Sequence, residues 1–394
     1  MSILAGVGFS QNPNPESAIN EAYTQAIIPL GNHTPTFILL YASSTAYDQQ
    51  RLLTEIYSKV NTTVIGCSTA GEITSAGGSL DSSVAMMLIY SDTMQFTTGI
   101  GHDLNINTRS AGKSLALDIQ NKGNGKPQAA LIMPDGLSGN GADIVRGVQD
   151  IFGQNFLVAG GSAGDDFHFK RTYQYFGDEI FSNSVVGVGF YGNFSYGIGV
   201  RHGWIPIGAP RIATKSKENI LYELDGKPAI DIYESNFGKE KILVNKQEPF
   251  AQKAITYPLG IPSPGKDGFL IRDAITVDEK GAITCAAEIP EGSEVYLMIG
   301  SREEAIDAAE DAAKNALAKL NGKKPKAIFL FNCIARKKLL MSKKHIEIEK
   351  IRAILGYDVP LIGFYTYGEQ APLGDQVITC SFHNETDVIF LLAE

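Results

Sequence analysis

The segments VIGCSTAGEI (residues 64–73), VAGGSAGDDF (residues 158–167) and LIGFYTYGEQ (residues 361–370) resemble one another. In each, an apolar run ends on small residues and is followed by a carboxylate side chain. This pattern is typical of a buried strand that ends in a tight turn. The chain therefore contains one local structure three times.

Each of these segments also has a similar upstream neighbour. The strand-like runs FILLYA, AALIMP and AIFLF begin at Phe37, Ala129 and Ala327. Apolar residues at i, i+3 and i+4 spacing fill the intervals and predict helices with one buried face. A further apolar stretch follows each turn. Short strands that alternate with such helices favour an α/β fold.

We therefore expect an α/β protein of two domains, built from repeated strand-helix-strand units with Gly-containing turns. The segment WIPIGAPR, which begins at Trp204, has two prolines and interrupts the pattern. The boundary is placed just after it. Residues 1–215 then hold two units, and residues 216–394 hold the third.

Composition excludes several classes of protein. The chain has 394 residues, of which 44% are hydrophobic, so it can bury sizeable cores. The longest apolar run, residues 84–90, is too short to span a bilayer, and membrane insertion is not expected. Four cysteines without CxxC spacing, and a start without a basic segment, favour a cytoplasmic location. The net charge of −9 argues against a nucleic-acid partner.

The first turn offers a candidate ligand site. Its backbone N–H groups and the side chains of Cys67, Ser68 and Thr69 suit a carboxylate or a phosphate, and Glu72 suits an amine. The alternative is that these side chains only satisfy the backbone of the turn. Both interpretations stay open.

The other two turns offer similar groups. Ser162, Asp165 and Asp166 follow the second strand, and a third set follows the last strand. The members of that third set are Tyr365, Tyr367 and Glu369. Packing alone also explains the tyrosines.

Residues 319–352 hold eleven lysines and arginines but only two acidic residues. Arg336, Lys337 and Lys338 lie at the centre of this segment. A guanidinium group is a planar fork that suits carboxylates. The segment could bind an anionic ligand, dock an acidic partner or form a solvated face.

Six motifs, in order, resemble the FIST family of bacterial sensory domains: GCSTAGEI, GGSAGDDF, ELDGKPAIDIY, FNCIAR, GFYTYGEQAP and FHNET. The resemblance implies a cytoplasmic signal-input module that binds a small molecule, such as an amino acid. It implies an output on another protein, often a histidine kinase or a cyclic-di-GMP enzyme. His383 and Asn384, in the FHNET motif, join the candidate ligand-binding residues.

Two alternatives accompany this interpretation. Some stand-alone FIST members resemble haem proteins that sense nitric oxide, and haem needs an imidazole that faces an apolar pocket. His102 and His202, which occupy similar places in the repeat, are the candidate haem ligands. The second alternative is an enzyme that uses Cys67 or the acidic residues of the turns. Because no base is implied beside Cys67, we expect a protein that is not an enzyme.

Overall fold

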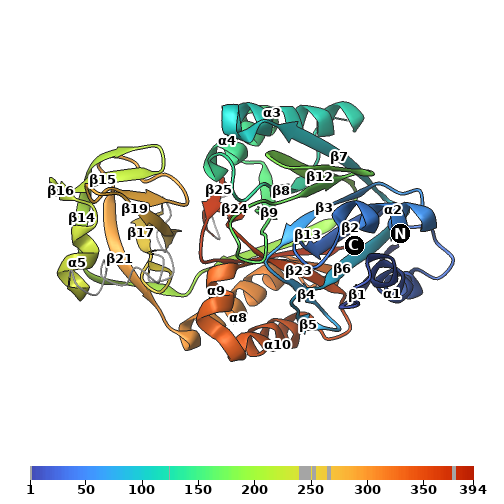
Figure 1. Ribbon diagram of the computed structural model, residues 1–394. Coiled ribbons are helices and arrows are strands. Elements are labelled where there is room, and N and C mark those ends of the chain that lie inside the picture. The colour runs from blue at the N-terminus through green and yellow to red at the C-terminus, as the bar shows by residue number, and fades with distance from the viewer. Residues whose placement is uncertain (1, 124, 239–249, 251–253, 264–267, 375–378) are drawn as a thin grey trace.

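The computed structural model describes residues 2–123, 125–238, 250, 254–263, 268–374 and 379–394. These residues form three six-stranded mixed sheets and one eight-stranded antiparallel sheet. In Figure 1 the strands of the three mixed sheets occupy the centre of the body, and helices such as α1, α3 and α10 lie around them. The α/β prediction is confirmed.

The first unit follows its local sequence signals. Asn14 caps the first helix by accepting a hydrogen bond from the backbone N–H of Ser17, and Pro15 takes the first helical position. Asp48 caps the second helix in the same way. The apolar face of each helix is buried as its spacing predicts. The unit contains β1 (Ile3–Ser10), α1 (Pro15–Ile27), β2 (Phe37–Ser43), α2 (Gln49–Lys59), β3 (Val64–Thr69) and β6 (Val84–Ser91).

The second and third units repeat this arrangement. In every unit the sheet order is first strand, last strand, second strand, third strand, and the second and third strands are parallel. The second unit contains β7 (Met94–His102), α3 (Leu104–Lys122), β8 (Ala129–Pro134), α4 (Gly141–Phe152), β9 (Leu157–Gly161) and β12 (Ser184–Gly192). The third contains β13 (Ser195–Arg201), α8 (Arg302–Ala318), β22 (Pro325–Cys333), α9 (Ile334–Leu340), α10 (Lys344–Leu355), β23 (Leu361–Thr366) and β26 (Asp387–Ala393). The predicted threefold repetition is confirmed.

The units are interlocked by exchanged hairpins. After its turn, each unit sends two short strands to complete the sheet of another unit: the first to the third, the second to the first and the third to the second. These strands are β4 (Glu72–Thr74) with β5 (Gly78–Ser79), β10 (Gln174–Phe176) with β11 (Glu179–Phe181), and β24 (Glu369–Pro372) with β25 (Cys380–His383).

A row of contacting aromatic side chains connects the three mixed sheets inside the body. Phe37 of β2 stacks on Phe96 of β7, with ring centroids 5.2 Å apart. Phe96 meets the edge of Phe190 of β12, and Phe190 stacks on Phe390 of β26 at 5.8 Å. Large buried aromatic rings contribute much of the apolar area that stabilises a core. The three units therefore share one interior.

The eight-stranded sheet is an insertion in the third unit and lies to one side of the body in Figure 1. It leaves the body after β13 and returns at α8, and Trp204 pairs with Gly300 where the chain leaves and returns. The expected boundary at residue 215 falls inside its first strand. The inserted sheet contains β14 (Trp204–Lys217), β15 (Ile220–Leu224), β16 (Lys227–Pro228), β17 (Leu259–Pro262), β18 (Phe269–Arg272), β19 (Ala274–Val277), β20 (Ile283–Cys285) and β21 (Glu294–Gly300), and α5 (Asp231–Phe237) follows β16.

Within the described part of the chain, no helix combines the length and the apolar character that crossing a bilayer requires.

Candidate functional site

The three predicted turns meet in a ring of backbone hydrogen bonds. Gly164 of the second turn donates to the carbonyl of Ser68 in the first at 3.0 Å. Tyr365 of the third turn donates to the carbonyl of Gly71 at 2.8 Å, and Ser162 donates to the carbonyl of Gly368 at 2.8 Å. Each turn therefore contacts both others at the ends of its strands. In parallel sheets, this end is where ligands bind.

The hydroxyl and carboxyl side chains of the turns bond mainly to the protein itself. Thr69 and Ser83 both donate to the buried carboxyl group of Glu72. Thr366 donates to Glu369 in the equivalent arrangement. Burial raises the pKa of Glu72 to about 7 and the pKa of Glu369 well above its usual range. These carboxyl groups lie in the interior rather than at a surface.

Asp165, the third carboxyl group of this series, also has internal partners. It accepts hydrogen bonds from the backbone N–H groups of Phe169, Lys170 and Arg171 at 2.6–2.9 Å. The Tyr367 hydroxyl donates to it at 2.5 Å. Asp165 therefore fixes the loop after the second turn.

Arg336 lies in the interior as well. Its guanidinium group is fully buried, forms ion pairs with Glu347 at 2.6 Å and Asp387 at 2.9 Å, and donates to the carbonyl groups of His202 and Ala305. The hydrogen-bond donors of the Arg336 guanidinium group are therefore engaged by groups of the protein itself.

Most of the predicted site residues are therefore buried and lie outside the two cavities described below. This group consists of Cys67, Ser68, Thr69, Glu72, Ser162, Asp165, Arg336, Tyr365, Glu369, His383 and Asn384. Asp166 and Tyr367 do line a cavity.

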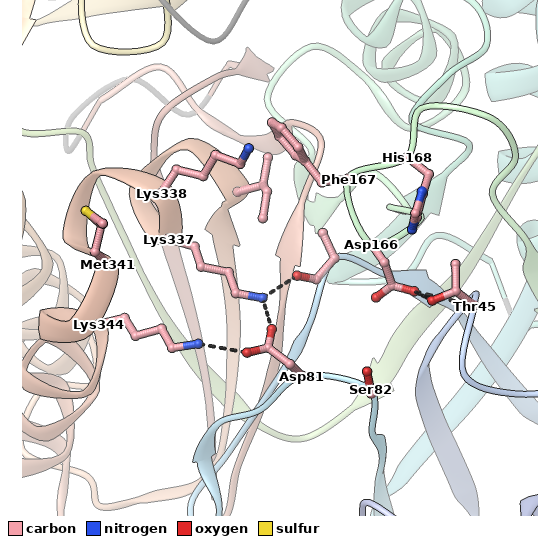
Figure 2. A pocket seen from close by; sticks show the side chains of 12 residues that line it. Thr45, Asp81, Ser82, Asp166, Phe167, His168, Lys337, Lys338, Met341 and Lys344 are labelled. Atoms are coloured by element: carbon pink, nitrogen blue, oxygen red, sulfur yellow. Dashed lines mark hydrogen bonds and ion pairs between the residues drawn. The ribbon is translucent and has the colours of Figure 1, made fainter. Parts of the chain in front are cut away.

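An open cavity of about 590 Å³, the lysine cavity, lies where the first two turns face α9. Figure 2 shows its side chains converging from the first unit, the second turn and the helices of the third unit. It is lined by Thr45, Ala70, Asp81, Ser82, Asp166, Phe167, His168, Ile334, Lys337, Lys338, Met341 and Lys344. The predicted basic segment thus contributes two of its central lysines to a cavity.

The three lysines of this cavity differ in their partners. Lys337 donates to the carbonyl of Ala70 at 2.7 Å and pairs with Asp81, and Lys344 pairs with Asp81 at 3.0 Å. Burial opposes ionisation of Asp81, but the hydrogen bonds and charges of Lys337 and Lys344 hold its pKa below its usual value. The Gly71 position allows this approach, because a Cβ there would lie 2.4 Å from the Lys337 Nζ.

Lys338 is the lysine that has no carboxylate partner among the described residues. Its Nζ lies 3.1 Å from the centroid of the Phe167 ring, a cation–π contact. Partial burial lowers the pKa of Lys338. An anion beside this ammonium group would stabilise its charged form and gain a charge-assisted hydrogen bond.

Asp166 presents a carboxylate oxygen to the same cavity. Its Oδ2 accepts hydrogen bonds from the hydroxyl groups of Ser43 and Thr45 and from the Thr45 backbone. Figure 2 shows its other oxygen turned away from Thr45. Asp166 and Phe167 both have left-handed backbone angles, with φ of 54° and 68°. Such strain in consecutive non-glycine residues is typical of functional sites.

A second cavity, the aromatic cavity, lies between the body and the inserted sheet and has a volume of about 60 Å³. It shares Phe167 and Ile334 with the lysine cavity. It is lined by Phe167, Phe169, Ile255, Asp273, Ala274, Ile275, Ala286, Cys333, Ile334, Ala335 and Tyr367. Residues of the second and third turn regions thus meet the inserted sheet here.

Family models match almost the whole of this arrangement: the FIST N domain over residues 36–227 and the FIST C domain over residues 229–372. The chain belongs to the FIST family. FIST domains are sensory domains of signal transduction that bind small ligands.

The FIST chain is also similar to proteins without an assigned function. An uncharacterized protein of Mycobacterium tuberculosis (strain CDC 1551 / Oshkosh) is 25% identical over 379 residues, which cover 93% of this chain and 94% of the relative. An uncharacterized protein of Methanocaldococcus jannaschii is 25% identical over 278 residues, covering 64% of this chain and 52% of the relative.

Solved structures give weaker similarity. A cyanuric acid hydrolase from A. caulinodans has a TM-score of 0.39 and 8% sequence identity. The alignment covers 100% of this chain and 99% of the hydrolase chain. PurLQS from Thermotoga maritima has a TM-score of 0.23 and 10% identity, and covers 99% of this chain and 72% of its own. At these scores neither carries its chemistry over to the FIST protein.

The two candidate haem ligands lie in different surroundings. His102 is exposed, its Nδ1 lies 3.2 Å from the Ser184 hydroxyl, and its ring contacts Phe181. His202 accepts a hydrogen bond from the Trp204 backbone through Nδ1, and burial with the charge of Arg336 lowers its pKa to about 3. Neither imidazole lines the lysine cavity or the aromatic cavity.

Cys67, the residue of the enzyme alternative, is also fully buried. Burial, with Glu72 nearby, raises the pKa of its thiol well above the usual range. A nucleophilic cysteine needs the thiolate, which this environment disfavours. Among the described residues, no cluster of His, Cys, Asp and Glu has a geometry that would hold a metal ion.

Sequence reasoning identified part of the lysine cavity. The charge run marked Lys337 and Lys338, and the carboxylate after the second turn marked Asp166. It missed Asp81 and Lys344. Asp81 lies in a loop that only the exchange of β4 and β5 brings to the third unit, and no local signal predicts that exchange.

Proposed function

We propose that this FIST protein is a small-molecule input module whose ligand binds in the lysine cavity. The ligand class is a small molecule that carries a carboxylate and an amine, such as an amino acid. One observation carries this proposal: the cavity offers an ammonium group and a carboxylate that do not pair with each other.

The chemistry of each end supports this ligand class. A ligand carboxylate at Lys338 would supply the anion that this lysine lacks among the described residues. A ligand amine at the outward oxygen of Asp166 would gain a second charge-assisted hydrogen bond. Phe167 and Ile334 offer apolar contact for the rest of the molecule.

Mass spectrometry and calorimetry test this proposal. Untargeted mass spectrometry of small molecules retained by the purified protein should find amino acids or close analogues. Titration of the matching compound should then show binding that Lys338→Met weakens by about tenfold or more, as expected when an ion pair to a bound ligand is lost. Lys326→Met, which removes an exposed lysine outside the cavity, is the matched control. Equal binding by both variants and the native protein would refute the site.

The family resemblance further supports a separate output protein, such as a histidine kinase or a cyclic-di-GMP enzyme. Ligand binding changes such a partner only if the ligand has different affinities for two states of the sensor. A shift from 1:99 to 99:1 requires roughly 5.5 kcal/mol of differential binding. We expect the activity of the co-purified partner to change with ligand, and Lys338→Met to remove that response.

The haem-binding nitric oxide sensor and the enzyme remain the competing proposals. A haem protein absorbs strongly near the Soret region, whereas an amino-acid sensor is colourless. An enzyme would convert the retained compound. We propose a sensor that is not an enzyme, and expect no Soret band and no turnover of the retained compound.

A further inference from the structure

The aromatic cavity combines a carboxyl group with an aromatic wall. Asp273, between β18 and β19, brings the carboxyl group from the inserted sheet. Phe167, Phe169 and Tyr367 bring the rings from the body, with centroids 4.7 Å apart for the first pair and 4.9 Å for the second. A volume of about 60 Å³ accommodates a small polar head group, since one water molecule needs roughly 10–15 Å³ on this measure.

Among the described residues, the Asp273 carboxyl group forms no ion pair, and the positive charge near it is that of Arg272. Asp273 Oδ1 is buried without a hydrogen-bond partner among the described residues. Its neighbour Arg272 donates to the carbonyl groups of Ile271, Glu288 and Phe382 instead, at 2.9–3.2 Å. A buried carboxylate that lacks a cation is costly, so the group either keeps a proton or binds a cation.

A second buried carboxyl group supports this conclusion. Glu385 is fully buried, and its carboxyl group shares a hydrogen bond with that of Asp273, so one of the two groups holds a proton in this contact. Burial raises the pKa of Asp273 to about 6 and that of Glu385 well above its usual range. Asn384, the preceding residue, is also fully buried, and both polar atoms of its amide lack partners. Neither Glu385 nor Asn384 lines the aromatic cavity, so Asp273 is the carboxyl group that a bound cation would contact there.

The aromatic rings of this cavity favour an ammonium group as the bound cation. The faces of aromatic rings attract ammonium groups, and the attraction grows when water is excluded. The Phe167 ring already holds one cation, since the Lys338 ammonium group lies over it. Among the described residues that line the aromatic cavity there is no lysine and no arginine.

We propose that the aromatic cavity binds the ammonium group of a small organic amine, with Asp273 as counter-ion and the Phe167, Phe169 and Tyr367 rings as its wall. This site adjoins the lysine cavity and shares Phe167 and Ile334 with it, but the proposal does not depend on the ligand site proposed there. Because its residues come from both the inserted sheet and the body, the bound amine would tie these two parts together.

Isothermal titration calorimetry of the full chain at pH 8 tests the site with three probes: n-butylammonium chloride, tetramethylammonium chloride and 1-butanol. We expect at least one ammonium probe to bind, and 1-butanol to bind at least tenfold more weakly. Asp273→Asn should weaken ammonium binding by at least tenfold. Glu279→Gln, which changes an exposed carboxyl group in the turn between β19 and β20, should leave ammonium binding unchanged.

A second variant tests the site even if Asp273→Asn fails to fold. Phe169 is 48% exposed, so Phe169→Leu should keep the fold while it reduces tetramethylammonium affinity several-fold. Affinity should also fall as the pH falls below about 6, because Asp273 then takes up a proton. Absence of binding by either ammonium probe, or equal affinity for 1-butanol, would overturn the proposal.

Discussion

Glu72 links the protonation of one buried residue to the stability of the fold. Its carboxyl group is fully buried, where Thr69 and Ser83 donate to it. Its pKa is about 7, against 4.5 for the usual value. The folded protein therefore holds this proton more tightly than the unfolded chain does. The contribution of Glu72 to stability is complete below pH 4.5 and is lost as the pH rises to about 7.

We expect Glu72→Gln to remove this pH dependence. The shift corresponds to about 3 kcal/mol, so the free energy of unfolding of the variant should rise relative to the native protein by up to about that amount between pH 4.5 and 7.5. Urea unfolding at several pH values measures the difference. The control is Glu279→Gln, at an exposed position. Parallel curves for Glu72→Gln and the native protein would contradict the assignment.

The thiol groups give a second prediction for single residues. Cys67, Cys285, Cys333 and Cys380 are all buried as thiols rather than disulfides, and burial raises the pKa of each. We expect no rapid reaction with Ellman's reagent in the native protein and four reactive thiols in urea. If one thiol reacted rapidly in the native protein and was assigned to Cys67, this result would support the enzyme alternative.

At the scale of elements, consecutive residues of α9 face in two directions, toward the interior and toward the lysine cavity. Arg336 points inward to Glu347 and Asp387, whereas Lys337 and Lys338 line the cavity. Through the carbonyl groups of His202 and Ala305, Arg336 also contacts both ends of the chain that enters and leaves the inserted sheet. This helix is therefore the element that connects the proposed ligand to the inserted sheet.

Arg336→Met should destabilise the protein by about 3–5 kcal/mol, because it leaves two buried carboxyl groups without their cation. Lys344→Met breaks an ion pair with the largely exposed Asp81 and should cost less than about 1 kcal/mol. Thermal or urea unfolding of both variants measures these values. A loss for Arg336→Met no larger than that for Lys344→Met would show that the buried ion pairs contribute little.

The sequence predicts the elements better than their partners. The 3.6-residue spacing and the capping residues Asn14 and Asp48 predict α1 and α2, because both signals act within one segment. The buried ion pairs of Arg336 join residues that are distant in the sequence, and no local pattern encodes them. The hydroxyl and carboxyl groups of the turns were predicted to bind a ligand because the sequence does not show their hydrogen-bond partners. Those partners become available only where the three turns fold together.

At the scale of the whole molecule, the exchanged hairpins make the three units one folding body. Each six-stranded sheet takes strands from two units, and β13 pairs with β26 across nearly two hundred residues of chain. A cut near residue 215 separates β13 from β26. We therefore expect separate fragments 1–215 and 216–394 to be largely unfolded alone, which circular dichroism measures. Two native-like fragments would contradict this interlocking.

The inserted sheet, in contrast, should be removable. Ile205 pairs with Ile299 where the sheet joins the body, so an Asn-Gly turn can replace residues 206–298 and close the two strands as a hairpin. The shortened protein should keep the circular dichroism of a folded body and unfold cooperatively. It loses Asp273, the proposed counter-ion of the aromatic cavity, but none of the described residues that line the lysine cavity. We expect it to lose ammonium binding and to retain the ligand of the lysine cavity, both measured by calorimetry. If both bindings disappeared from a folded body, the two cavities would be parts of one site that needs the inserted sheet.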